Sequence, residues 1–178
     1  MIKYTCEIAF ICFTALILAS CGVKTKSAGG GSTGLVQIFT KGKDSLLCFA
    51  GPTKYNSVEN SDKFEIDHTY LKVKDHSNPV VCNFSLISRD ASIRPSSVTI
   101  LLGTQTLQTD SLTKLYAEGY GKKDYIYRYS FQVSDSLFYQ WMQTPKPIVK
   151  VDNRTFEGGK DFRKDSNEIF RKILFDIY

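Results

Sequence analysis

Residues 125–131 read YIYRYSF, and this short stretch decides the class of fold. Aromatic residues occupy every second position, with isoleucine, arginine and serine between them. A period of two is the period of a β-strand, whose neighbouring side chains point to opposite faces of a sheet. The residues just before it, Gly121 to Asp124 (GKKD), predict a turn. We therefore expect a hairpin in which Leu112–Tyr120 is the preceding strand.

Similar runs of β-branched and aromatic residues recur along the chain between turn signals. They cover Leu35–Thr40, Leu46–Ala50, Phe64–Val73, Val80–Ser88, Val98–Leu107, Leu112–Tyr120, Tyr125–Val133 and Ile148–Val151. Gly51-Pro52 and Glu157-Gly158-Gly159 are among the turns that separate them. This rhythm predicts an antiparallel sheet of about seven to eight strands, sandwich-like or a curved meander. A change of apolar parity after Tyr70 predicts a β-bulge near that residue.

Two segments have the spacing of helices. Ser134 is suited to cap a short helix, which must end by Pro145. Near the end of the chain, a capping-box variant at Asp165–Glu168 precedes an apolar stripe. The stripe consists of Ile169, Phe170, Ile173, Leu174 and Ile177. Such a stripe needs a partner surface, so the chain is predicted to be α+β, with an amphipathic C-terminal helix packed on the sheet.

The start of the chain has the layout of a secretory signal peptide, with Lys3, then an apolar stretch of about 11 residues and small residues after it. A membrane-spanning helix needs about 20 apolar residues, so this stretch is too short to be a permanent anchor. Leu18-Ala19-Ser20-Cys21 resembles the lipobox of bacterial lipoproteins at all four positions. The resemblance implies that residues 1–20 are removed and that the Cys21 thiol carries a diacylglyceryl group. An ordinary secretory cleavage or a buried apolar helix are the alternatives.

The same resemblance implies a cellular location. Residues 21–34 would form the lipidated cysteine and a flexible Gly/Ser-rich linker, and residues 35–178 a single domain. Several acyl chains would hold that domain firmly at a membrane. Because no acidic run follows Cys21, we expect a protein on the outer membrane that faces the periplasm, with the cell surface as the alternative.

The charges of the chain argue against a nucleic-acid partner. Lys and Arg number 23 against 18 Asp and Glu, which gives a net charge of +5. The basic residues are spread along the chain rather than gathered in a stripe or a known motif, so no nucleic acid is expected as a partner.

The five cysteines divide by position. Cys6 and Cys12 would leave with the signal peptide, and Cys21 would be lipidated. Cys48 and Cys82 remain, and in an oxidising envelope two remaining cysteines predict one disulfide. Two buried thiols, or a reactive nucleophile, are the alternatives.

Residues that carry chemistry are few. The only histidines are His68 and His76, each after an aspartate. On a strand, Asp67 and His68 would point to opposite faces, which disfavours a catalytic pair. No metal-binding spacing, phosphate loop or nucleophile elbow is present, so no metal, no cofactor and no catalytic residue is assigned. A hydrolase that uses Cys48 or His76 is kept as a minor alternative.

The stretch around residue 127 also has a binding interpretation. Tyr125, Tyr127 and Tyr129 share one face of their strand, where they either pack in the core or form a platform for a sugar ring or a protein. If the tyrosines are exposed and contiguous, binding becomes the leading interpretation.

A tripeptide of Asp, Ser and Leu occurs three times, with its serines at Ser45, Ser111 and Ser136. Asp-Ser is suited to turns and helix starts. The tripeptide also resembles an O-glycosylation signal that one large group of gut and oral bacteria uses on exported proteins.

Together these features predict a small envelope lipoprotein with a non-catalytic role in binding or envelope support. Its partners would be the membrane, through the lipid, and a protein or glycan. An inhibitor or immunity-type protein that occludes a toxin or hydrolase is the first alternative, and the hydrolase is the second.

Overall fold

The computed structural model describes residues 34–40, 45–73, 76 and 78–177. The predicted signal peptide, Cys21 and almost all of the predicted linker lie outside these residues. The strands are β1 (Val36–Thr40), β2 (Ser45–Ser57), β3 (Lys63–Val73), β4 (Val80–Ser88), β5 (Val98–Leu102), β6 (Gln105–Thr109), β7 (Thr113–Tyr120), β8 (Asp124–Val133), β9 (Ile148–Val151) and β10 (Arg154–Gly158). The helices are α2 (Asp135–Gln143) and α3 (Lys160–Ile177). Within the described part of the chain, neither helix has the length and apolar character that crossing a bilayer requires.

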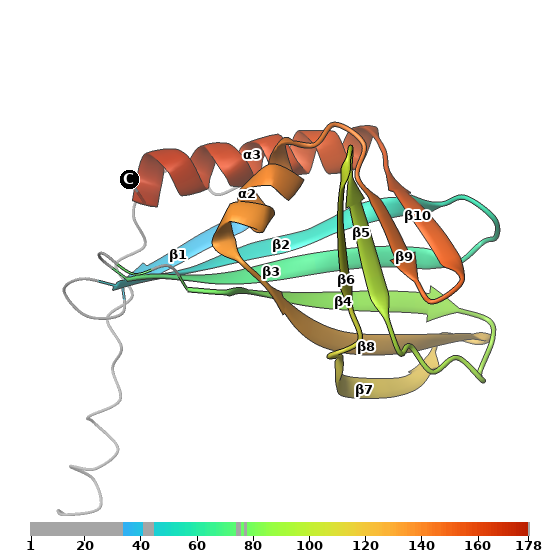
Figure 1. Cartoon of the computed structure of the whole chain (residues 1–178). Helices are drawn as coiled ribbons and strands as arrows, with labels where there is room; N and C mark the ends of the chain where they lie inside the picture. The colour runs from blue at the N-terminus through green and yellow to red at the C-terminus, as the bar shows by residue number, and fades with distance from the viewer. Residues whose placement is uncertain (1–33, 41–44, 74–75, 77, 178) are drawn as a thin grey trace, which may run out of the picture.

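All strands belong to one antiparallel sheet in the order β6-β5-β9-β10-β2-β3-β4-β8-β7, and β1 also pairs with β2. Strand β2 is central, because β3 pairs along one side of it while β1 and β10 share the other side. The sheet curls into a half-barrel, and both helices pack on its inner side (Figure 1). The predicted α+β class and the C-terminal helix on an antiparallel sheet are therefore confirmed, with somewhat more strands than expected.

The extra strands come from two hairpins that the sequence did not separate. The stretch predicted as one strand over 98–107 turns at Gly103, whose φ of 64° is the left-handed conformation that glycine adopts readily. A second turn at Asp152, with φ of 51°, lets β10 pair with β9. Both hairpins extend the same sheet, because β10 pairs with β2 and β5 pairs with β9.

The bulge lies in β2 and not near Tyr70. Buried residues alternate regularly along β3 as far as Tyr70, whereas the β2–β3 register shifts between Ala50 and Thr53. Gly51-Pro52, predicted as a turn between strands, occupies this shift inside one long strand. Proline is tolerated there because a bulge leaves a ladder position without an N–H partner. The Gly51 N–H donates to the Leu35 carbonyl at 2.5 Å, which holds the start of β1 against the bulge.

The two helices differ in how well their starts were predicted. Ser134 caps α2 as expected, because its hydroxyl accepts a hydrogen bond from the Leu137 N–H at 3.3 Å. Helix α3 begins at Lys160, so the predicted capping box at Asp165–Glu168 is wrong. Phe162 is buried and extends the apolar stripe toward the N-terminus. Ser166 is buried inside the helix, where its hydroxyl donates to the Arg163 carbonyl at 3.2 Å.

The predicted disulfide is also wrong, because Cys48 and Cys82 are both buried thiols. Cys48 on β2 is opposite Tyr70, and Cys82 on β4 is opposite His68, so all of β3 lies between them. Strands two apart in a sheet are separated by roughly 9–10 Å, whereas a disulfide needs Cα atoms within about 7 Å. The two sulfurs share the inner face of the sheet without meeting.

Candidate functional site

His68 lies on the inner face of the sheet and is sealed from solvent. Its side chain is 1% exposed, and its ring contacts Phe138 and Trp141 of α2 at centroid distances of 5.0 and 5.4 Å. Neither ring nitrogen has a hydrogen-bond partner. Burial lowers the pKa of His68 from 6.5 to about 4, although the nearby Asp67 carboxylate opposes this shift. The imidazole is thus neutral near pH 7, and its ring is enclosed by Phe138 and Trp141 of α2.

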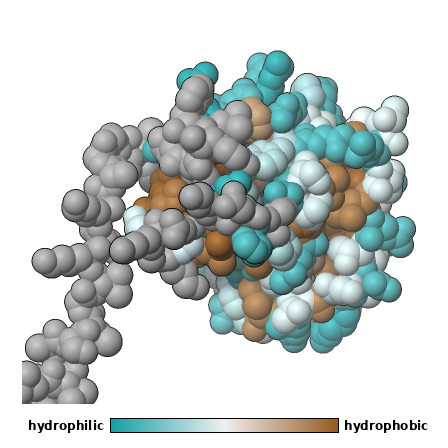
Figure 2. Space-filling view, turned by 60° about the vertical axis from the view of Figure 1, so that its left-hand side comes forward, coloured by the Kyte–Doolittle hydropathy of each residue, from teal (hydrophilic) through white to brown (hydrophobic). Residues whose placement is uncertain are grey.

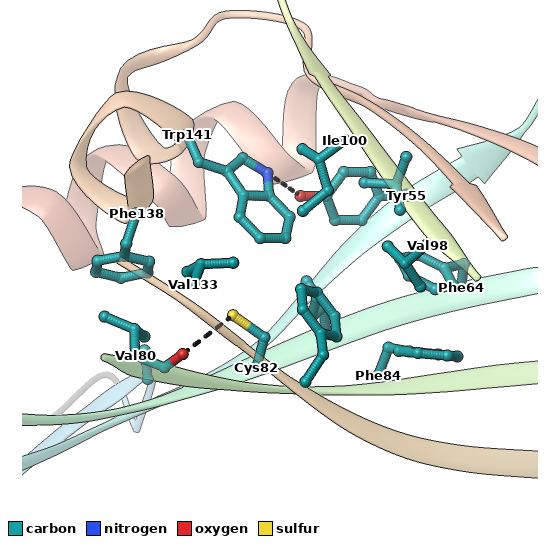
Figure 3. Packing of buried hydrophobic residues seen from close by; sticks show 14 of the residues in the cluster. Tyr55, Phe64, Val80, Cys82, Phe84, Val98, Ile100, Val133, Phe138 and Trp141 are labelled. Atoms are coloured by element: carbon teal, nitrogen blue, oxygen red, sulfur yellow. Dashed lines mark hydrogen bonds between the residues drawn. The ribbon is translucent and has the colours of Figure 1, made fainter. Parts of the chain in front are cut away.

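Cys82 sits opposite His68 and is equally enclosed (Figure 3). Its thiol is fully buried and lies 3.9 Å from the Val80 carbonyl. Burial raises the pKa of Cys82 well above its ordinary value, and the negative charge of Asp67 raises it further by a smaller amount. Because only a thiolate is an effective nucleophile, this His–Cys pair is not arranged for catalysis.

The other candidates for chemistry are not gathered into a site. Cys48 is 1% exposed, whereas His76 is exposed beside the end of β3. The described residues contain no group of three or more His, Cys, Asp or Glu side chains that could hold a metal ion.

The three tyrosines of β8 do not form an exposed platform. Tyr127 and Tyr129 are 2% and 6% exposed, and only Tyr125, at 39%, reaches solvent. The Tyr129 ring stacks on Phe84 with centroids 5.7 Å apart, and the Tyr127 hydroxyl donates to the Asp90 carbonyl at 2.8 Å. Tyr127 and Tyr129 thus pack in the core, which was one of the two interpretations of their sequence, and they do not form a binding platform.

The opposite, outer face of the sheet carries an ordered group of polar side chains, which we call the polar strip: Asp67 on β3, Asn83 and Ser85 on β4, and Arg128 on β8. Arg128 pairs with the Asp67 carboxylate and donates to the Ser85 hydroxyl at 2.7 Å. Asn83 donates to the other Asp67 oxygen at 2.9 Å. The side chains of Arg128 and Asp67 are 24% and 21% exposed. Neighbouring strands thus hold charged and amide groups in fixed orientations at the surface.

Beside this strip, the β2 bulge forms a shallow hollow of about 260 Å³. It is lined by Gly34, Leu35, Gln37, Phe49, Ala50, Gly51, Pro52, Asp67 and His68. Phe49 is 40% exposed, and Phe39 supports its ring in an edge-on contact with centroids 5.7 Å apart. The hollow does not follow from the sequence when Gly51-Pro52 is interpreted as a turn between strands, because it forms only where these residues stay inside β2. The alternation that buries Cys48 and Ala50 could have placed Phe49 on the outer face.

More apolar surface lies along the β7–β8 hairpin. All eight residues of β7 are exposed, and Leu115, Tyr116 and Tyr120 are 47%, 41% and 48% exposed. Strand β7 forms one edge of the sheet, and its register with β8 shifts between Lys114 and Tyr116. A bulge and a lysine on an edge strand both hinder pairing with another chain. Exposed hydrophobic patches are separated by polar residues on the face shown in Figure 2.

The three candidate glycosylation serines are at accessible or partly accessible positions. Ser45 begins β2 and is half-buried, whereas Ser111 lies in the exposed segment between β6 and β7. Ser136 is exposed in the first turn of α2, where its N–H donates to the Asp135 side chain at 2.6 Å.

Comparison with known proteins adds no relative: no protein-family model, no curated protein and no solved structure matches the chain.

Proposed function

We propose that the chain is a non-catalytic binding module of the bacterial envelope, tethered to a membrane by a lipid on Cys21. The observation that carries the binding role is the outer face of the sheet, where the polar strip lies beside the hollow that contains Phe49. Binding sites typically combine apolar and aromatic lining with a few well-placed polar groups. The inner face gives no support to a hydrolase, because His68 and Cys82 are enclosed by the core.

The tether rests on the match of Leu18-Ala19-Ser20-Cys21 to a lipobox. Acyl chains bind a bilayer through roughly 0.8 kcal/mol per buried methylene, so two or more chains hold a domain durably. The outer membrane facing the periplasm is the proposed location, with the cell surface as the alternative.

Replacing the lipidated cysteine tests the tether. In Cys21→Ala the protein should move from the membrane pellet to the soluble fraction, or remain as an uncleaved precursor of higher mass. Cys12→Ala is the matched control, because it removes a thiol from the same segment but outside the lipobox, and it should change neither property. Unchanged membrane retention and mass in Cys21→Ala would exclude the tether.

The binding role is tested with envelope material. The full-length protein, immobilised in a detergent without a sugar headgroup, should retain a specific component from detergent-solubilised envelopes, with heat-unfolded protein as the control. Retention of the same components by the folded and unfolded proteins would contradict a binding role.

A further inference from the structure

We propose that the hollow at the β2 bulge is a subsite for one sugar ring of a neutral glycan. This inference rests on the proposed binding function and adds a location and a ligand class to it. It is carried by the shape of the hollow, the exposed aromatic ring within it and the balanced charges of its wall.

The size of the hollow suits a single small ring. Its volume of about 260 Å³ lies just below the range of roughly 300–1,000 Å³ that is usual for drug-sized ligands. It is shaped by backbone, since the Gly51 N–H bonds to Leu35 and the register of β2 shifts at this point. A rim built from backbone loses little conformational entropy when a ligand binds, and this matters most for a ligand that makes few strong contacts, such as a sugar.

Phe49 supplies the apolar platform. Its ring is 40% exposed, and the edge-on contact with Phe39 at 5.7 Å and 77° fixes the ring orientation. A sugar ring presents a face of C–H groups that can pack on an aromatic ring, while its hydroxyls remain at the rim. A platform that is already oriented in the unbound protein does not have to be ordered on binding.

Polar side chains at the wall and rim of the hollow can form hydrogen bonds with the hydroxyl groups of a sugar. Asp67 accepts hydrogen bonds from Asn83 and Arg128 that fix its carboxylate, and its two oxygens have about four acceptor sites in total. Sites therefore remain for hydroxyl donors of a ligand. Gln37 is exposed at the same hollow and its amide can both donate and accept.

The charges of the wall favour a neutral ligand. Among the described residues that line the hollow, Asp67 is the one anionic side chain, and it is paired with the cation of Arg128 in the polar strip. An anionic ligand would meet the Asp67 carboxylate, and to gain Arg128 it would have to break an ion pair that is already three-quarters buried. A neutral polyol needs neither change.

The test is calorimetric titration of the full-length protein with maltohexaose, cellohexaose, xylohexaose, mannohexaose and the anionic hexamer of galacturonic acid. At least one neutral oligosaccharide should bind. In Phe49→Ala its Kd should rise about thirtyfold, because about 40% of a ring area of roughly 200 Å² loses its partner. Phe49→Tyr keeps the platform and should retain binding, and Gln37→Ala should weaken it several-fold. Because Gln37 is exposed, Gln37→Ala tests the site even if Phe49→Ala is unstable.

Val58→Ala is the matched control, since Val58 is 59% exposed and lies outside the hollow. Its affinity should equal that of the unmodified protein. The proposal is overturned if no neutral oligosaccharide binds, if only the anionic hexamer binds, or if neither Phe49→Ala nor Gln37→Ala weakens binding. If envelope components are retained while every neutral oligosaccharide fails, the binding function stands and the glycan subsite does not. If both fail, both proposals fall.

Discussion

Replacing His68 by leucine should flatten the acid side of the stability profile of this protein. His68 is buried against Phe138 and Trp141 with no partner for either nitrogen, and its pKa in the folded chain is about 4, against 6.5 when solvated. Between these two values the unfolded chain binds a proton that the folded chain does not. Unfolding therefore becomes easier as the pH falls from 6.5 to 4, and the loss is complete below about pH 4.

The size of this effect follows from the two pKa values. Each pH unit in the interval costs about 1.4 kcal/mol, so His68 removes about 3 kcal/mol from the free energy of unfolding between pH 7 and pH 4. Carboxylates also titrate in this range, but they do so in both proteins. The comparison between the unmodified protein and His68→Leu cancels their contribution, and any constant effect of the leucine on packing cancels as well.

Urea unfolding at pH 7, 6, 5 and 4 measures the free energy of unfolding of both proteins. The signal is the fluorescence of Trp141, which is the one tryptophan of the chain. The unmodified protein should lose about 3 kcal/mol more than His68→Leu over this range. His76→Leu is the matched control, because His76 is exposed, and it should follow the unmodified protein. Parallel profiles for the unmodified protein and His68→Leu would refute the reasoning.

Two further predictions concern buried groups of the core. Without reductant, Cys48 and Cys82 should resist alkylation in the folded protein and both react after unfolding, since β3 separates the two thiols; failure to react after unfolding would indicate a disulfide. Trp141→Phe should lower the free energy of unfolding by about 1–3 kcal/mol or more, because it leaves the buried Tyr55 hydroxyl without the indole donor 2.9 Å away. A urea double-mutant cycle with Tyr55→Phe should give a non-additive coupling, and strictly additive effects would exclude this bond as a contributor.

Much of the fold could be read from local patterns. The period of two in YIYRYSF predicts β8, and Ser134 with the apolar spacing behind it predicts α2, because both signals depend only on neighbouring residues. The position of the bulge and the start of α3 depended on more distant partners. Gly51-Pro52 stays inside β2 because β1 and β3 hold it on both sides, and Phe162 begins the helix stripe early because the sheet offers it a buried place.

The candidate site was less accessible to sequence reasoning. Pairing two cysteines assumed that their strands are neighbours, whereas the sheet order places β3 between them. The tyrosines of β8 were identified as sharing a face, but only the curl of the sheet decides that this face is the buried one. Phe49 and Asp67 lie on different strands, so their place at one hollow follows from register and cannot be seen in either stretch alone.

The central place of β2 has a consequence for how the chain folds. One of its edges is completed by β1 at the beginning of the domain and by β10 near the end. During synthesis, the second half of that edge stays open until Arg154–Gly158 is available. Pairings between distant segments slow folding, and an unfinished strand edge attracts other chains. Truncation before β10 should thus yield an aggregating polypeptide and not a smaller version of the domain.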